Sequence, residues 1–193
     1  MSMWEHATKT LFNMLRTRQH QLPEQLPDLT ELAGDKKKDL SFGVTHPRKL
    51  VYLSNEKKVG IRTIRLLLAC MEEGQYQAAL CVFVSPPTPF AKRELVALQQ
   101  ETPSRWVELF YTSELRIDIT QHQLVPRHVQ LSTQEAEAVL KQYKASHQHI
   151  PKILLTDPMA RYLGLREGEM VRVERKMGNQ GQLPMYRIAA SPS

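Results

Sequence analysis

The chain reads Asp157-Pro-Met-Ala-Arg-Tyr-Leu-Gly-Leu-Arg-Glu-Gly-Glu-Met-Val-Arg-Val173 in the stretch that decides its C-terminal fold. Asp157 is a favourable helix N-cap because its carboxylate accepts hydrogen bonds from the first amides of a helix, and Pro158 is tolerated at the first helical position because that amide needs no partner. Gly164 permits the left-handed backbone that ends a helix, and Gly168 stands where a turn needs a positive φ. The stretch therefore predicts a short helix, a glycine turn and a strand.

The segments on either side of this stretch complete a small α+β unit. Val171 and Val173 alternate with polar neighbours, which is typical of a strand buried on one face, and residues 185–188 predict a second strand. Upstream, Ser132 and Glu135 have the spacing of a capping box that opens a helix running to about residue 145. Three side chains are larger than capping requires and are predicted to lie on the surface of the unit: Arg161, Tyr162 and Arg187.

The composition is that of a soluble globular protein with one large or two small domains. The 193 residues are 41% hydrophobic and 24% charged. Cys70 and Cys81 both lie inside apolar runs, so we expect buried free thiols in a reducing compartment. The longest apolar run, residues 66–71, is far shorter than the roughly 20 residues that cross a bilayer, and no secretory pattern opens the chain. We expect an intracellular protein with no membrane partner.

Positive charge is concentrated in one N-terminal segment. The whole chain has a net charge of +6 and a pI near 9.4, which indicates a polyanionic partner. Residues 36–65 hold nine basic residues and two acidic ones, a net charge of +7, whereas residues 1–35 and 66–122 are net negative. The basic residues of this segment are Lys36, Lys37, Lys38, Arg48, Lys49, Lys57, Lys58, Arg62 and Arg65.

Strand and helix patterns alternate in the first 122 residues, which predicts an α/β layer with some parallel strand pairing. Apolar periodicity predicts helices over residues 3–16, 61–73 and 90–101. The predicted strands span residues 40–44, 50–53, 78–84, 106–111 and 115–120. The third of these strands is apolar throughout, so we expect it to be buried on both faces. The character of the sequence then changes, and we predict two domains, residues 1–122 and 123–193.

The C-terminal stretch closely resembles the C-terminal domain of the shared fifth subunit of eukaryotic nuclear RNA polymerases, a domain that archaeal RNA polymerases also contain. The resemblance covers roughly residues 39–190. Glu56-Lys-Lys-Val-Gly-Ile-Arg-Thr-Ile-Arg65 looks like the family's Lys-Val-Gly-Ile segment, and Thr88-Pro-Phe-Ala-Lys92 looks like its Thr-Pro loop. In that loop the family commonly has a small residue where this chain has Phe90.

The resemblance implies a non-catalytic subunit of a DNA-directed RNA polymerase that supports transcription in the nucleus. Eukaryotic members have an N-terminal jaw domain ahead of the assembly domain, and this chain has both parts. The implied fold is an α/β jaw of endonuclease-like topology followed by a small α+β assembly domain. The jaw would lie along downstream duplex DNA, and the assembly domain would dock on the largest subunit and other core subunits. No cofactor, metal, catalytic residue or small-molecule substrate is implied.

Two groups of residues are candidates for these contacts. Contacts between basic side chains and phosphates give a salt-sensitive attraction that does not read bases, which suits an enzyme that moves along DNA. The DNA-facing candidates are Lys57, Lys58, Arg62, Arg65, Thr88, Pro89 and Lys92. The candidates for docking or for the structure of the assembly domain are Asp157, Pro158, Ala160, Arg161, Tyr162, Gly164, Gly168, Tyr186 and Arg187.

The residues by themselves leave other functions open. Asp39 and Glu56-Lys57-Lys58 have a loose Asp…Glu-x-Lys spacing that can hold a magnesium ion at a scissile phosphate, although this spacing is common by chance. The basic pI also allows a free-standing nucleic-acid-binding module, although the interleaved aromatic residues of a base-stacking platform are absent. The histidines at positions 122, 128, 147 and 149 lack the cysteines or carboxylates that would complete a metal site, and we interpret them as solvated.

Overall fold

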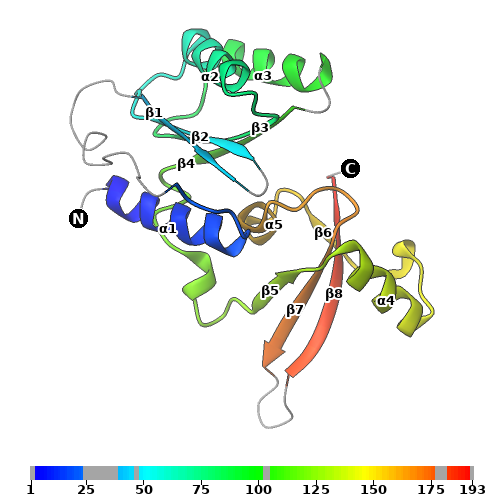
Figure 1. The fold of residues 1–193 in the computed structure, drawn as a ribbon. Helices are drawn as coiled ribbons and strands as arrows, with labels where there is room; N and C mark the ends of the chain where they lie inside the picture. Colours follow the sequence, from blue (N-terminus) through cyan, green and yellow to red (C-terminus); the bar gives the residue numbers. More distant parts are fainter. Residues whose placement is uncertain (1–2, 24–38, 46–47, 102–104, 177–181, 192–193) are drawn as a thin grey trace. The chain divides into compact units, whose positions relative to one another are not determined.

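The computed structural model describes residues 3–23, 39–45, 48–101, 105–176 and 182–191. The chain divides into two compact units, Met1–Ile117 and Asp118–Ser193. The sequence places a boundary at residue 122, and the two units divide between Ile117 and Asp118. Each unit has its own mixed sheet with helices, so the chain is a mixed α/β protein (Figure 1).

Helices and strands of the N-terminal unit follow the order that the apolar periodicity predicts. In chain order they are α1 (Met3–Thr17), β1 (Asp39–Val44), β2 (Lys49–Ser54), α2 (Ile61–Glu73), β3 (Ala78–Phe83), α3 (Pro89–Glu101) and β4 (Trp106–Tyr111). The predictions of three helices and four strands in this part are confirmed to within a few residues at their ends. Gly74 ends α2, and its amide donates to the carbonyl oxygen of Cys70.

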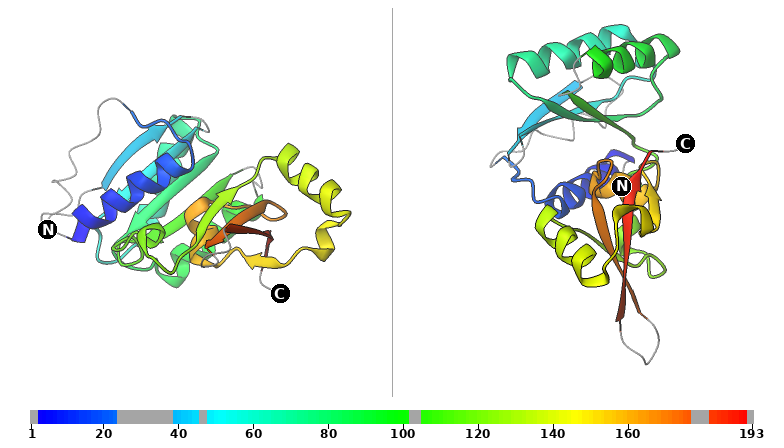
Figure 2. Two further views of the ribbon diagram at one scale, coloured as in Figure 1. Left: turned by 90° about the horizontal axis from the view of Figure 1, so that it is seen from below. Right: turned by 90° about the vertical axis from the view of Figure 1, so that its right-hand side faces the viewer.

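The strands of this unit form one sheet in the order β1-β2-β3-β4. β1 is antiparallel to β2, whereas β2, β3 and β4 are parallel to one another, which confirms the predicted parallel pairing. Parallel neighbours need a crossover, and α2 and α3 provide the two crossovers on the same face of the sheet (Figures 1 and 2). Because β2 and β3 run in the same direction, the loops that follow them leave the same edge of the sheet.

The main core of the N-terminal unit lies between this sheet and the two crossover helices. All six residues of β3 are buried, as the continuous apolar run predicts. Of the two cysteines, which are both free thiols, Cys81 is buried in β3 and Cys70 is half-buried on α2. The buried residues of this core are Leu50, Tyr52, Val59, Ile64, Leu67, Met71, Ala79, Cys81, Phe83, Ala91, Leu95 and Val107.

Helix α1 covers the opposite face of the sheet. Its apolar stripe includes Leu11, Met14 and Leu15, which are at most 1% exposed. The rings of Phe12 on α1 and Phe42 on β1 lie 6.4 Å apart, so Phe42 lies on the face of the sheet that α1 covers. The N-terminal unit therefore has three layers, with one helix on one side of the sheet and two on the other (Figure 1).

A buried ionic cluster connects the end of α1 to the sheet. The carboxylate of Glu108 on β4 accepts hydrogen bonds from Arg18 at 2.7 Å and from Lys49 on β2 at 2.9 Å. The three side chains are only 4–10% exposed. Burial alone would raise the pKa of Glu108, but the charges of Arg18 and Lys49 outweigh it and hold this pKa below its usual value. The two basic side chains therefore keep the Glu108 carboxylate charged inside the unit.

The C-terminal unit has a four-stranded sheet in the order β5-β7-β8-β6 and confirms the predicted capping box and glycine turn. Ser132 and Glu135 cap the start of α4 (Thr133–Tyr143) reciprocally. The hydrogen bonds from Ser132 hold the pKa of the exposed Glu135 carboxyl below its usual value. The elements are η2 (Ile119–Gln121), β5 (Arg127–Gln130), α4 (Thr133–Tyr143), η3 (His147–His149), β6 (Lys152–Leu154), α5 (Pro158–Leu163), β7 (Met170–Lys176) and β8 (Gln182–Ala190).

The core of this unit lies between α4 and one face of the sheet, where Val139 packs with Met170 and Ile188. The sequence predicts a strand over residues 115–120, and this prediction is wrong. The side chain of Asp118 accepts a hydrogen bond from the amide of Thr120, and this local bond caps a 3-10 helix instead. None of the helices in the described residues has the length and apolar character of a membrane span.

We predict that Glu108→Gln lowers the stability of the N-terminal unit by about 3–5 kcal/mol, because it leaves Arg18 and Lys49 as uncompensated buried charges. The measurement is denaturant unfolding followed by tryptophan fluorescence, since both tryptophans, Trp4 and Trp106, belong to this unit. The matched control is Glu72→Gln, which removes the more exposed ion pair with Arg105 and should change stability by less than about 1 kcal/mol. Equal effects of the two substitutions would contradict the assignment.

The same cluster predicts a pH dependence. The pKa of Glu108 is lower in the folded than in the unfolded chain, so its contribution is complete above the ordinary glutamate pKa of about 4.3 and is lost as the pH falls through the folded pKa. The stability difference between the parent protein and Glu108→Gln should therefore be constant near neutral pH and shrink below about pH 4. A difference that grows on acidification would show that the sign is wrong.

Candidate functional site

The loops after β2 and β3 meet at one edge of the N-terminal sheet. The backbone amide of Thr88 donates to the carbonyl oxygen of Val59 at 3.0 Å, which joins the two loops directly. Thr88 also caps the start of α3, because its hydroxyl accepts from the amide of Ala91 at 3.4 Å. The structure thus brings the Lys57–Lys58 loop and the Thr-Pro loop together, although about 30 residues separate them in the sequence.

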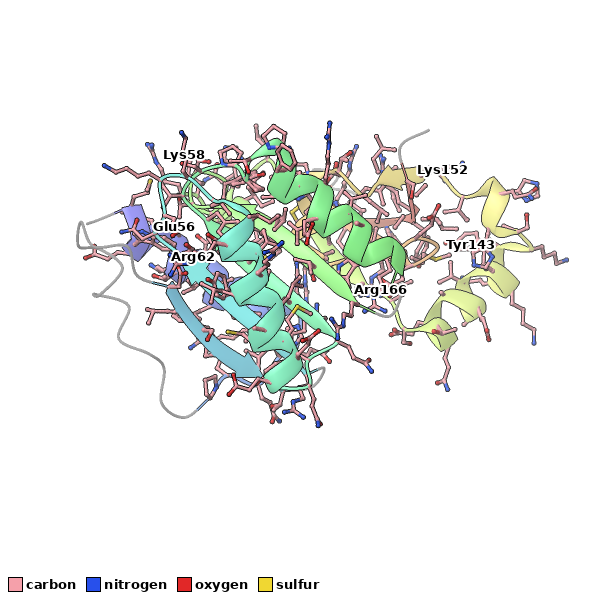
Figure 3. The ribbon with its side chains drawn as sticks, turned by 90° about the horizontal axis from the view of Figure 1, so that it is seen from above. Glu56, Lys58, Arg62, Tyr143, Lys152 and Arg166 are labelled. Atoms are coloured by element: carbon pink, nitrogen blue, oxygen red, sulfur yellow. The ribbon has the colours of Figure 1, made fainter. Side chains whose placement is uncertain are left out.

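Two buried or half-buried side chains hold the first of these loops in place. Val59 is completely buried in the core beneath the loop. The hydroxyl of Thr63 on α2 donates to the carboxylate of Glu56, so the loop is also held against the first turn of the helix. Lys57 and Lys58, between these two anchors, are exposed. Figure 3 shows Glu56, Lys58 and Arg62 around the start of α2.

Five exposed cations surround this edge, and we call them the basic rim: Lys57, Lys58, Arg62, Arg65 and Lys92. Arg62 and Arg65 lie on consecutive turns of α2, and Lys92 lies in the first turn of α3. Within the described ranges, no carboxylate forms an ion pair with any member of the rim. Their positive charges are therefore available to an external anion.

The other basic residues of the 36–65 segment do not join the rim, so the charge concentrated in the sequence does not form one surface patch. Lys49 is buried in the ion pair with Glu108. Arg48 precedes β2 at the opposite end of the strand, where its guanidinium lies 5.0 Å from the ring centroid of Tyr76. The three lysines at positions 36–38 lie outside the described residues. Sequence proximity misleads here because a strand advances about 3.3 Å per residue and separates its two ends.

The Thr-Pro loop presents one unexpected side chain beside the rim. Pro89 is exposed at the first position of α3, where a missing amide costs nothing. The next residue, Phe90, is 72% exposed, whereas Ala91 is completely buried. The apolar periodicity of the sequence places Phe90 in the helix but does not by itself predict its exposure.

The caps of α5 have the geometry that the sequence predicts. The carboxylate of Asp157 accepts from the amide of Met159 at 2.8 Å, and Pro158 occupies the first turn. Gly164 has a φ of 70° and Gly168 a φ of +84°, both in the left-handed region. These glycines and the cap explain why the segment folds, and they leave few side chains to contact a partner.

Of the three predicted surface groups in the C-terminal unit, Tyr162 contradicts the prediction. It is only 4% exposed, and it is one of four buried residues among the six of α5. Arg161 and Arg187 are half-buried, and Arg187 donates to the carbonyl oxygen of Lys152 at 3.4 Å. Ala160 is buried as a core residue.

Tyr143 and Tyr186 form an aromatic pair on the C-terminal unit that the sequence did not predict. The rings of Tyr186 on β8 and Tyr143 on α4 are 5.8 Å apart, and Tyr143 is 54% exposed. The two residues are 43 positions apart in the sequence, so no local pattern could have predicted the contact.

The two acidic residues of the possible nuclease pattern already have partners. The carboxylate of Asp39 accepts from the hydroxyl of Tyr52 at 2.6 Å, across the β1–β2 pair. The carboxylate of Glu56 accepts from Thr63 and holds the loop. In the part of the chain that the structure describes, no group of three or more His, Cys, Asp or Glu residues is placed to hold a metal ion. Both carboxylates therefore have structural roles, and these roles explain the two residues without any nuclease activity.

Comparison with known proteins finds similarity over both units. Residues 117–189 match the family model described as RNA polymerase Rpb5, C-terminal domain. The chain is 31% identical to the DNA-directed RNA polymerases I, II, and III subunit RPABC1 of Caenorhabditis briggsae, over 93% of this chain and 92% of the relative. Identity to the subunit of the same name is 30% in Caenorhabditis elegans, with the same coverage. In Dictyostelium discoideum it is 36%, over 72% of this chain and 70% of the relative.

Proposed function

Because this chain belongs to the family of the shared RNA polymerase subunit RPABC1, we propose that it is a non-catalytic subunit of a DNA-directed RNA polymerase in the nucleus. The observation that carries the proposal is the extent of the similarity, which covers 93% of the chain and therefore includes both compact units. In this role the protein contributes binding surfaces, and the chemistry of RNA synthesis belongs to other subunits.

We assign docking on the polymerase core, including the largest subunit, to the C-terminal unit. The family model covers residues 117–189, which is nearly the whole of this unit. Arg161 and Arg187 are the candidate contacts, since arginine at an interface can form paired hydrogen bonds to carboxylates and can stack on aromatic rings. Tyr162 is buried, and we interpret it as a structural residue.

The N-terminal unit is proposed to be the jaw, with an endonuclease-like topology, and to face downstream duplex DNA through the basic rim. The support is physical. The rim combines five exposed cations, and the Thr88–Val59 hydrogen bond and the Glu56–Thr63 contact restrain the loops that carry or precede them. Cations on restrained elements attract phosphates without reading bases, so the DNA can advance while it remains held.

Two alternatives have distinct signatures. A free-standing nucleic-acid-binding module would migrate in a cell extract at the mass of a small protein, whereas a polymerase subunit would migrate with a very large complex. The magnesium-dependent nuclease is disfavoured because Asp39 and Glu56 are engaged by Tyr52 and Thr63. Magnesium-dependent cleavage of a plasmid by the purified chain would revive it.

We predict that the affinity-purified chain carries the large subunits of a nuclear polymerase, and that Arg161→Glu combined with Arg187→Glu reduces their recovery several-fold. The reason is that two cations at the proposed interface become anions. Recovery is measured by mass spectrometry of the purified complex, which also identifies the polymerase.

The control for docking is Lys141→Glu with Lys144→Glu, which makes the same charge change at exposed positions on and next to α4. Circular dichroism checks that both double variants are folded. Full recovery of the large subunits by the Arg161 and Arg187 variant would remove these residues from the interface.

We predict that changing Lys57, Lys58, Arg62 and Arg65 together to Ala leaves assembly intact and weakens retention of downstream DNA. Each lost phosphate contact should lower the slope of log affinity against log salt by about 0.9. Retention is measured by the dissociation of polymerase from a downstream duplex across a salt titration.

The control for the rim removes the same charge elsewhere on the N-terminal unit, by changing four exposed residues together to Ala: Lys9, Arg16, Arg48 and Arg116. Its salt slope should equal that of the parent polymerase. If the rim variant and this control behave alike, the rim does not contact DNA.

A further inference from the structure

Phe90 is the most exposed large hydrophobic side chain in the described residues of the N-terminal unit, at 72%. It stands at the second position of α3, directly after Pro89. The helix does not need this ring for packing, because its contacts with the core come from Ala91 and Leu95, which are at most 5% exposed. An exposed phenylalanine at this position therefore calls for an explanation outside the fold of the unit.

The surroundings of Phe90 within the chain do not cover it. The guanidinium of Arg93 lies 6.0 Å from the ring centroid, at the outer limit of a cation–π contact, and the ring stays exposed. Val96, the other large hydrophobic residue of α3 that is exposed among the described side chains, is six positions further along, which places it about 120° away around the helix. Among the described side chains, Phe90 therefore projects separately from the other large exposed hydrophobic residue of α3.

Cations surround this projection. Lys92 follows Phe90 in the first turn of α3, and the Thr88–Val59 hydrogen bond places the Lys57–Lys58 loop beside the start of the helix. A surface of this kind is complementary to a ligand that combines regular negative charge with apolar faces. Duplex DNA has both, because phosphates line the edges of the minor groove and sugars form its walls.

We propose that Phe90 enters the minor groove of the duplex and makes an apolar contact there, while Lys57, Lys58 and Lys92 bind the flanking phosphates. This inference rests on the proposed function of the basic rim and adds to it a contact that is not ionic. A single ring fits a duplex better than a single strand, since single-strand binders stack successive bases on several aromatic residues. Phenylalanine is among the side chains that proteins insert into the minor groove.

An apolar contact has a signature that separates it from the lysines. Loss of a phosphate contact changes the number of counterions released, so it changes the salt slope. Loss of the Phe90 contact does not change the number of counterions that binding releases, so it should weaken binding by the same factor at every salt concentration.

The test compares polymerase containing Phe90→Ser with the parent in the same downstream-duplex dissociation assay. We expect retention to fall roughly tenfold at each salt concentration with an unchanged slope, and Phe90→Trp to retain most of the parent affinity. Val96→Ser is the matched control, because it removes an exposed apolar side chain from the same helix, and it should behave as the parent. Thermal unfolding of the two serine variants verifies that neither change affects the fold.

Each other result would overturn the inference. Parent-like retention by Phe90→Ser would exclude the contact, and a changed salt slope would show that the substitution acts through the cations. Unchanged DNA retention with loss of a co-purifying protein would identify Phe90 as a protein-docking residue. If the four-residue rim variant also retains DNA normally, the proposed DNA-facing role fails as well. If only the rim variant weakens retention, the Phe90 contact alone is wrong.

Discussion

Every side chain of β3 is withdrawn from water, and this burial dictates how the rest of the N-terminal unit is built. A strand that is apolar on both faces can only be stable if both faces of its sheet are covered. Helices α2 and α3 cover one face, because β2, β3 and β4 are parallel and each parallel connection has to return the chain across the sheet through a helix. The remaining face is covered by α1, which lies at the N-terminal end of the unit's sequence.

This layered arrangement separates two uses of positive charge. On the α1 face, Arg18 and Lys49 are held in the interior and are compensated by Glu108, so they contribute to the fold. At the edge where β2 and β3 end, the rim cations are exposed and have no carboxylate partner among the described residues. The parallel direction of β2 and β3 sends both rim loops to one edge of the sheet and leaves Arg48 at the other.

The two units also differ in how many of their distinctive residues are needed for the fold itself. In the C-terminal unit, caps and glycine turns account for most of the distinctive stretch: Asp157, Gly164 and Gly168 have backbone roles, and Tyr162 is buried. The residues left to distinguish a docking surface are few, and the family relationship carries that assignment. In the N-terminal unit, the physical evidence is stronger, since Phe90 and the rim are exposed side chains that the fold itself does not require.

Local physics was sufficient for much of the structure. The capping box at Ser132, the short helix after Asp157, the positive φ of Gly168 and the strand–helix alternation before residue 112 depend on side chains within a turn or two, so the sequence by itself determined them. The strand expected over residues 115–120 failed because a bond from Asp118 to its own neighbour competed with strand pairing.

Contacts between distant residues were decided only by the tertiary structure. Lys49 lies among exposed basic residues in the sequence, yet its partner, Glu108, is 59 positions away and removes it from the surface. The meeting of Thr88 with Val59 and the exposure of Phe90 likewise follow from which strands run parallel and which helix faces are covered. The sequence determined which groups carry charge and which segments form helices and strands. Only the packing of the sheet decided which charges face water, because burial depends on neighbours that no local pattern contains.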